Sequence, residues 1–438
     1  MIIRNGRIWT EGDLVTRDLH IEEESIVEIG ASLAGDDGID ATGMLVLPGV
    51  VDAHVHFNEP GRTHWEGFET GSAALAAGGG TSFVDMPLNA APPTIDRESF
   101  EAKRAAGEAS SRLDFALWGG LIPGNIDKLE ELAECGVVGF KAFMVDSGTE
   151  DFPGIDPKSL RAGMAVAARL RLPVAVHAED SAMIAERTAA IRAAGRKTAS
   201  AWTDSRPLES EVEAVRVALE LAGETGCALH VVHVSAPEAV DRIHAARAAG
   251  ADVTCEVCPH HVLLSDAAMH EHGALAKCAP PLRSEETRAE LWRMLLDGRF
   301  DCVGSDHSPA PPDMKTGDDF FRMWGGIMGC QHGFLLLLDA VLEHAPERLG
   351  DVWAAVSERP ARRFGLDRWK GRIAPGFDAD LVLVATDPPR TITADELLYR
   401  HRTSPYIGRA IRSRVVRSFS RGRELGLQPA GGRFLSRR

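Results

Sequence analysis

The chain has 438 residues, of which 44% are hydrophobic and 26% are charged, and this is the ordinary composition of a globular protein. Its 48 Lys and Arg residues against 64 Asp and Glu residues give a formal net charge of −16, which argues against a nucleic-acid-binding protein because an acidic surface repels phosphate backbones. No run of eighteen apolar residues is present, so we expect no membrane-spanning helix.

The first 48 residues alternate between apolar and polar side chains, as half-exposed strands do. Arg4, Arg7, Glu11 and Asp13 interrupt the apolar stretch that a secretory signal would need. Seven cysteines are an odd number and too few for a disulfide scaffold in a chain of this length. We therefore expect a cytoplasmic protein with reduced thiols.

From residue 49 onward, apolar stretches of strand length alternate with helical patterns rich in Ala, Leu, Glu and Arg. Strands are predicted over residues 49–57, 81–86, 114–119, 137–143, 173–177, 228–234, 252–258 and 301–305. Helices are predicted over residues 66–77, 97–109, 125–135, 157–170, 208–223, 237–249 and 285–296. Fully apolar strands that alternate with helices are typical of parallel α/β folds, and eight such units predict a (β/α)₈ barrel over residues 49–365.

The C-terminal part of the chain returns to the alternating pattern of the N-terminus, punctuated by turns and without a helical period. We therefore predict a small β-sandwich domain that flanks the barrel and is built from both termini, residues 1–48 and 366–438.

Two histidines stand near the end of the first predicted barrel strand, in the sequence VVDAHVHF. Side chains at i and i+2 of a strand share a face, so His54 and His56 point the same way. Functional sites of such barrels lie at the C-terminal ends of the strands, and this pattern is typical of a metal site. The alternative interpretation is a pair of core histidines that bond to the backbone.

Further polar residues fall at the ends of later strands. Lys141 stands in an apolar strand, either as an amine available for covalent chemistry or as a lysine that reaches out to solvent. His177 ends the fifth strand, and the nearby His230 and His233 point to opposite faces of the sixth, so we select His233 because it lies nearer the strand end. Asp306 ends the eighth strand, where a carboxylate can bind a metal or act as a general base.

At these residues the chain resembles the cyclic amidohydrolases, a group that includes dihydroorotases, hydantoinases or dihydropyrimidinases, and allantoinases. The resemblance runs nearly from end to end, through PGVVDAHVHF, GFKAFM, HVSAPE, EVCPHH, GSDHSP and KGRIAPGFDADL. The segments MPLN, KCAPPLR and WGGIMGCQ are most similar to the allantoinases.

The resemblance implies a site with two divalent metal ions. His54, His56 and Asp306 would hold one ion, and His177 and His233 would hold the other. Lys141 would be an N6-carboxylysine, formed with carbon dioxide, that bridges both. Zinc is the first choice for the metal, with manganese, cobalt, iron or nickel as alternatives. A hydroxide held between the two metals would attack the ring amide, and Asp306 would transfer the proton.

Two positions depart from the dihydroorotase pattern, which provides charged groups for a substrate carboxylate. Asn58 stands where those enzymes have an arginine, and Ala310 stands where they have a histidine. The resemblance therefore implies an uncharged ring as substrate, namely allantoin, which would be opened to allantoate in purine breakdown. The expected substrate contacts are Asn89, His261, Cys278, Gly325 and Gly326.

The resemblance also implies a homotetramer. Alternatives for the activity are a hydantoinase or dihydropyrimidinase, and a dihydroorotase-like enzyme. An alternative of another class is a non-catalytic scaffold relative, but such proteins lose metal ligands and all six ligand positions are filled here.

Overall fold

A closed barrel of parallel strands forms the centre of the molecule. The structure, a computed structural model, describes residues 1–35, 38–426 and 431–437. Neighbouring barrel strands pair in parallel, and the bridge between Val55 and His307 closes the ring. The strands are β6 (Val50–Val55), β7 (Gly80–Asp85), β8 (Asp114–Leu117) with its continuation β9 (Gly119–Gly120), β10 (Phe140–Phe143), β11 (Val174–His177), β12 (Leu229–Val231), β13 (Val253–Val257) and β14 (Cys302–Val303). Each coincides with a predicted strand, so the predicted (β/α)₈ barrel is confirmed.

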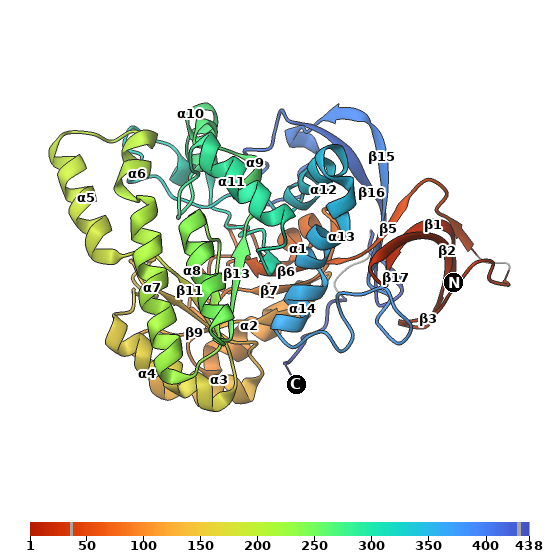
Figure 1. Cartoon of the computed structure of the whole chain (residues 1–438), viewed down its shortest axis with the longest axis horizontal. Helices are drawn as coiled ribbons and strands as arrows, with labels where there is room; N and C mark the ends of the chain where they lie inside the picture. Colours follow the sequence, from red (N-terminus) through yellow and green to blue (C-terminus); the bar gives the residue numbers. More distant parts are fainter. Residues whose placement is uncertain (36–37, 427–430, 438) are drawn as a thin grey trace.

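Helices cover the outside of the barrel (Figure 1). Those that coincide with predicted helices are α1 (Phe68–Ala77), α2 (Arg97–Ser110), α3 (Leu129–Cys135), α4 (Pro157–Leu170), α7 (Leu208–Thr225), α8 (Pro237–Ala248) and α11 (Glu285–Leu296). The others are α5 (Ser181–Ala193), α6 (Ala199–Ser205), α9 (Pro259–Leu263), α10 (Ala267–His272), α12 (Gly333–His344), α13 (Leu349–Val356) and α14 (Glu358–Arg363).

Local sequence signals explain where several of these helices begin. The Asp156 side chain accepts hydrogen bonds from the first backbone N–H groups of α4, and Pro157 occupies the first helical position. Asp96 and Ser99 form a reciprocal capping box at the start of α2.

Side chains on successive strand positions belong to two different cores. In β11, Val174 and Val176 pack in the layer between strands and helices, whereas Ala175 packs inside the barrel. The interior also contains Trp118, whose indole N–H donates to the carbonyl of Ala53 at 3.1 Å. The interior is therefore a packed core, and the site above it is confined to the end of the barrel.

The two termini form one sheet beside the barrel, at the right of Figure 1. Its strands are β1 (Ile2–Thr10), β2 (Asp13–Glu22), β3 (Ser25–Gly30), β4 (Gly38–Asp40), β5 (Leu45–Pro48), β15 (Leu381–Thr391), β16 (Ala410–Ser420) and β17 (Arg423–Glu424). Their order is β17-β16-β15-β5-β1-β2-β3, with β4 beside β1. Ile26 from one end of the sheet and Phe419 from the other share one core, as expected of a sheet folded over on itself. The predicted β-sandwich built from both termini is confirmed.

A buried ion cluster joins this sheet to the barrel. The Lys370 ammonium group donates to Asp114 at 2.7 Å, at the start of β8, and to Asp380 at 2.8 Å, just before β15. Residues 431–437 also lie against the barrel, where the backbone N–H of Leu435 donates to the carbonyl of Phe115 at 2.7 Å. We retain residues 48/49 and 365/366 as the proposed domain boundaries, with this final segment returning to the barrel.

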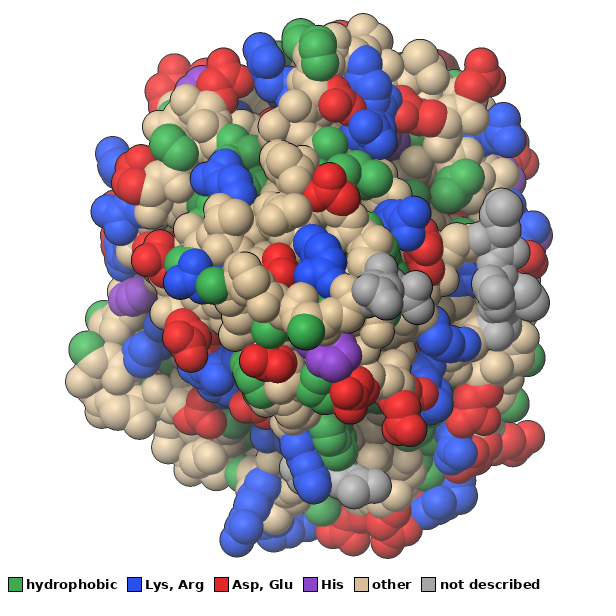
Figure 2. All heavy atoms as spheres, turned by 90° about the vertical axis from the view of Figure 1, so that its right-hand side faces the viewer, with side chains coloured by type: hydrophobic (Ala, Val, Ile, Leu, Met, Phe, Trp, Pro, Cys, Tyr) green, Lys and Arg blue, Asp and Glu red, His purple; other side chains and the backbone are tan. Residues whose placement is uncertain are grey.

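Acidic and basic side chains are interspersed on the face that Figure 2 shows, which is the face of the terminal sheet. None of the helices within the described ranges has the length and apolar character needed to cross a bilayer. All seven cysteines are described, and none of them forms a disulfide.

Candidate active site

A cavity of about 830 Å³ opens at the C-terminal ends of the barrel strands. Its lining includes five of the six predicted metal ligands, namely His54, His56, His177, His233 and Asp306. The barrel therefore brings together residues that are separated by up to 252 positions in the chain, counted from His54 to Asp306. The cavity also receives side chains from α5, α6 and the loop that follows β14.

His54, His56 and Asp306 form the first cluster of donor atoms. The Nε2 atoms of His54 and His56 lie 3.3 and 3.4 Å from the same carboxylate oxygen of Asp306. All three donor atoms lie within 4.8 Å of one another, which suits a shared ion. Burial opposes the ionisation of Asp306, but the two histidines keep its pKa below the ordinary value, so the carboxylate is charged.

His177 and His233 form the second cluster, with ring centres 4.6 Å apart. Burial lowers the pKa of both histidines, so both are neutral and able to act as ligands. His230 does not line the cavity and instead bonds to the hydroxyl of Thr254 at 2.8 Å. The structure thus places His233 at the cavity and His230 away from it.

Lys141 lies on β10 and is completely buried. Its ammonium nitrogen has no hydrogen-bond partner among the described residues, and an unpaired buried cation is costly. Burial lowers the pKa of Lys141 to about 8, while Glu256 and Asp306 act in the opposite direction. The neutral amine that addition of carbon dioxide requires is therefore accessible near neutral pH.

Two buried glutamates that sequence reasoning missed orient the histidines. Glu256 on β13 bonds to Nδ1 of His54 at 2.6 Å, and Glu179 bonds to Nε2 of His177 at 2.6 Å. Each bond occupies one ring nitrogen and leaves the other able to bind a metal ion. The signal was present in the sequence, because a glutamate within the apolar strand CEVC is as unusual as Lys141 in its own strand.

Replacing Glu256 by glutamine should lower metal affinity by about 10–100-fold, the usual effect of losing such an outer partner. The amide cannot accept from His54 with the strength of a carboxylate, so the ring is less firmly held. Competition with a chelator measures the affinity. Glu211→Gln is the matched control, because Glu211 is equally buried but bonds to Ser235 and Arg283. Equal affinity of Glu256→Gln and the wild-type protein would contradict this role.

Backbone strain marks two of the site residues. His233 has a φ of 40° and Asp306 a φ of 44°, a region that residues with a Cβ rarely adopt. Such conformations persist where the surrounding structure holds them, and they concentrate at functional sites.

The expected substrate contacts are only partly brought to the cavity. Asn89, Cys278, Gly325 and Gly326 line it, whereas His261 does not and instead lies 3.2 Å from the carbonyl of Pro280. The N–H of Gly326 donates to the carbonyl of Lys277 at 2.7 Å, and its own carbonyl accepts from Lys315 at 2.7 Å. Nothing in the part of the chain that the structure describes bonds to the N–H or the carbonyl of Gly325, so these two groups remain available.

The two positions that depart from the dihydroorotase pattern both lie outside the cavity lining. Asn58 is buried and donates to the carbonyl of Pro309 at 3.2 Å, and Ala310 is also buried. Neither side chain places a charge at the cavity wall.

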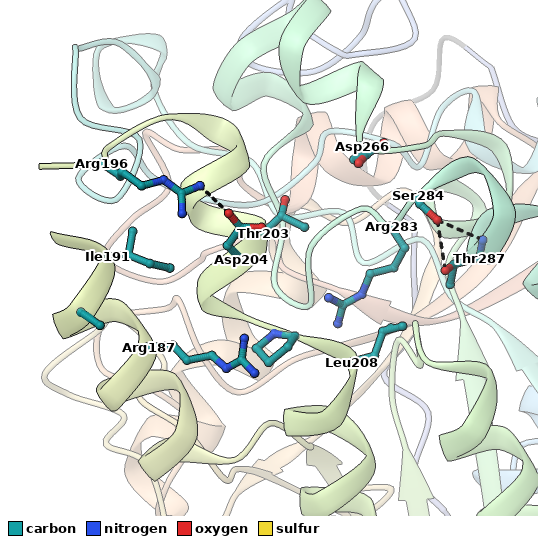
Figure 3. Close-up of a pocket in the computed structure, with 12 residues that line it drawn as sticks. Arg187, Ile191, Arg196, Thr203, Asp204, Leu208, Asp266, Arg283, Ser284 and Thr287 are labelled. Atoms are coloured by element: carbon teal, nitrogen blue, oxygen red, sulfur yellow. Dashed lines mark hydrogen bonds and ion pairs between the residues drawn. The ribbon is translucent and has the colours of Figure 1, made fainter. Parts of the chain in front are cut away.

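A second cavity, of about 530 Å³, lies among α5, α6 and the start of α11 (Figure 3). Its lining contains no histidine or cysteine, and two of its charged groups, Arg196 and Asp204, pair with each other. It therefore lacks the donor set of the first cavity.

Comparison with known proteins places this site in a family. The model of the family described as "Amidohydrolase family" matches residues 45–422. A protein named allantoinase from Rubrobacter xylanophilus is 49% identical, over 100% of this chain and 95% of that protein. Another from Deinococcus radiodurans is 48% identical, over 96% of this chain and 94% of that protein.

Solved structures also match this chain over its whole length. L-hydantoinase (dihydropyrimidinase) from Arthrobacter aurescens superimposes with a TM-score of 0.96 and 31% identity, over 100% of this chain and 99% of that one. Dihydropyrimidinase from Brevibacillus agri superimposes with a TM-score of 0.91 and 30% identity, over 100% of this chain and 98% of that one. On its sequence, its fold and the arrangement of its site, the chain belongs to the amidohydrolase family.

Proposed function

We propose that this protein hydrolyses the ring amide of allantoin to give allantoate. One observation carries the choice of substrate, namely the 48–49% identity, over nearly the whole length, to relatives that bear the name allantoinase. The cluster of donor atoms at the barrel end supports the reaction type, because five of the proposed ligands line one cavity.

The residues present fit two divalent ions. His54, His56 and Asp306 would hold one and His177 and His233 the other, with Lys141 between them as a carboxylated lysine. The unpaired Nζ of Lys141 supports this assignment, because carboxylation replaces an unpaired buried cation with an anionic ligand. When bound, such ions lower the pKa of water towards neutrality and polarise a carbonyl group.

The protein's own residues would then supply proton transfer and orientation. The Asp306 carboxylate is ionised and accepts the proton of the attacking water, then passes it to the departing ring nitrogen. Asn89 and Gly325 are the groups that would bind the amide edges of the ring and the ureido substituent, since both line the cavity and carry donors and acceptors.

Further parts of the proposal concern the ions, the assembly and the compartment. We propose zinc, because imidazole and carboxylate ligands suit it, and a homotetramer, as the family resemblance implies. We propose a cytoplasmic protein, which the absence of a disulfide among the seven cysteines supports.

A substrate panel tests the function. The protein is reconstituted with divalent metal and bicarbonate, then offered allantoin, dihydroorotate, dihydrouracil and hydantoin in parallel. We expect allantoin to be preferred by at least about 100-fold in kcat/KM, since unpaired polar groups in the site penalise rings that lack the ureido group. Preference for another ring would overturn the substrate, and no hydrolysis of any ring would favour a scaffold protein.

The second candidate is a hydantoinase or dihydropyrimidinase. The Arthrobacter aurescens enzyme superimposes with a TM-score of 0.96, but at 31% identity it is less similar in sequence than the relatives named allantoinase at 48–49%, so this candidate stands second. The same panel separates the two, because a hydantoinase would open hydantoin or dihydrouracil faster than allantoin.

A further inference from the structure

Two buried lysines beside the cavity lack an acidic partner. Lys277 is 2% exposed and Lys315 is 7% exposed, and no carboxylate of the described residues lies within 4.0 Å of either ammonium group. Burial lowers the pKa of each lysine to about 7. Because a buried amine without a counterion is costly, its contacts need an explanation.

Both amines instead bind backbone carbonyl groups of one loop, residues 320–326. Lys277 Nζ donates to the carbonyl of Phe320 at 2.7 Å and also to that of Met323. Lys315 Nζ donates to the carbonyl of Gly326 at 2.7 Å and, at a longer 3.4 Å, to those of Trp324 and, outside the loop, Ala274. The Lys277 amine makes two such bonds and the Lys315 amine makes three, and a charged lysine carries three N–H donors.

Loop 320–326 forms one wall of the cavity, because all of its residues except Phe320 belong to the lining. It contains neither helix nor strand, so no regular ladder holds its carbonyl groups in place. Gly326 has a φ of +105°, and a Cβ there would lie 2.3 Å from the carbonyl oxygen of Ser308. The loop therefore packs closely against the segment that follows Asp306.

Gly325 is the one described residue of the loop whose N–H and carbonyl both lack a hydrogen bond. Among the described residues, none bonds to the N–H or the carbonyl of Gly325, whereas both groups of Gly326 are occupied. The two amines thus pin the loop on both sides of Gly325.

We propose that Lys277 and Lys315 are positioning residues, which hold loop 320–326 so that the N–H and carbonyl of Gly325 face the substrate. That this substrate is allantoin rests on the proposed function, whereas the anchoring of the loop by the two lysines does not. Neither lysine takes part in the chemistry, and their effect is on binding of the ring.

Lys315→Met tests this, because Lys315 does not line the cavity and its loss leaves the lining side chains unchanged. We expect KM for allantoin to rise at least about 10-fold and kcat to change less than about 3-fold, since lost orientation of the bound ring weakens binding before chemistry. Deuterium uptake of the peptide that contains 320–326 should quicken at least about 10-fold, while metal content stays at the wild-type level. Lys315→Arg, which keeps N–H donors, should bring both KM and the deuterium uptake of the loop part of the way back to the wild-type values.

Lys370→Met is the matched control. It removes an equally buried lysine from the cluster that joins barrel and sheet, and should lower stability without changing KM or exchange in the loop. A folded Lys315→Met protein with wild-type KM and loop exchange would overturn the proposal, and so would faster exchange spread over the whole barrel. If that variant does not fold, Lys315→Ala, which also lacks a side-chain N–H donor, takes its place with the same expected results and the same contrary outcomes. Failure of the wild-type protein to open allantoin would defeat the proposed function, while loop exchange would still decide whether the lysines anchor the loop.

Discussion

Lys141→Ala should lose bound metal and catalytic activity together. Alanine cannot form the carboxylated side chain that we place between the two ions, and nothing else at that buried position supplies an oxygen ligand. Metals of this kind contribute several kcal/mol to the stabilisation of the transition state, so kcat/KM should fall by at least about 10³-fold. Elemental analysis of the purified variant and the rate of allantoin opening measure the two quantities.

Two further variants sharpen this test. Lys141→Met fills the space of the lysine without an amine and should behave like the alanine variant, which separates the ligand from its volume. Acetate or propionate should restore part of the activity of Lys141→Ala, because a small carboxylate can enter the space left by the missing side chain. Retention of full metal content and activity in Lys141→Ala would contradict the bridging role.

The barrel and the position of its site could be predicted because one pattern in the sequence carries both. The barrel strands are apolar runs. Polar residues such as His177 and Asp306 stand at, or shortly after, the strand end that faces the cavity. Burial on both faces of the strand leaves few reasons for a polar residue there other than function. The same reasoning could have found Glu256, but a mid-strand glutamate has no neighbour in the sequence that reveals its contact with His54.

The substrate-facing wall could not be predicted in this way. Loop 320–326 has no periodicity, and its shape depends on amines from Lys277 and Lys315, one of which lies more than forty residues earlier in the chain. His261 is an example. Its position beside other motif residues in the sequence suggested a substrate contact. Helix α9 instead places it outside the lining of the cavity. Contacts of this kind arise from tertiary packing, for which residue spacing provides no rule.

Asp306→Asn should abolish most of the activity while affecting metal content less than Lys141→Ala does. The amide oxygen of asparagine can still act as a weak ligand beside His54 and His56, but an amide cannot accept and return a proton. General acid–base groups contribute about 10²–10⁴-fold to rates, so we expect kcat to fall by about 10³-fold.

Steady-state rates and elemental analysis on the same preparation distinguish this outcome from simple loss of metal. His56→Asn is the matched control, because it removes a neighbouring ligand at 3.4 Å from Asp306 but leaves the base in place. Its activity should recover when metal is added in excess, whereas that of Asp306→Asn should not. Recovery of Asp306→Asn by added metal would show that the carboxylate serves only as a ligand, and that another group moves the proton.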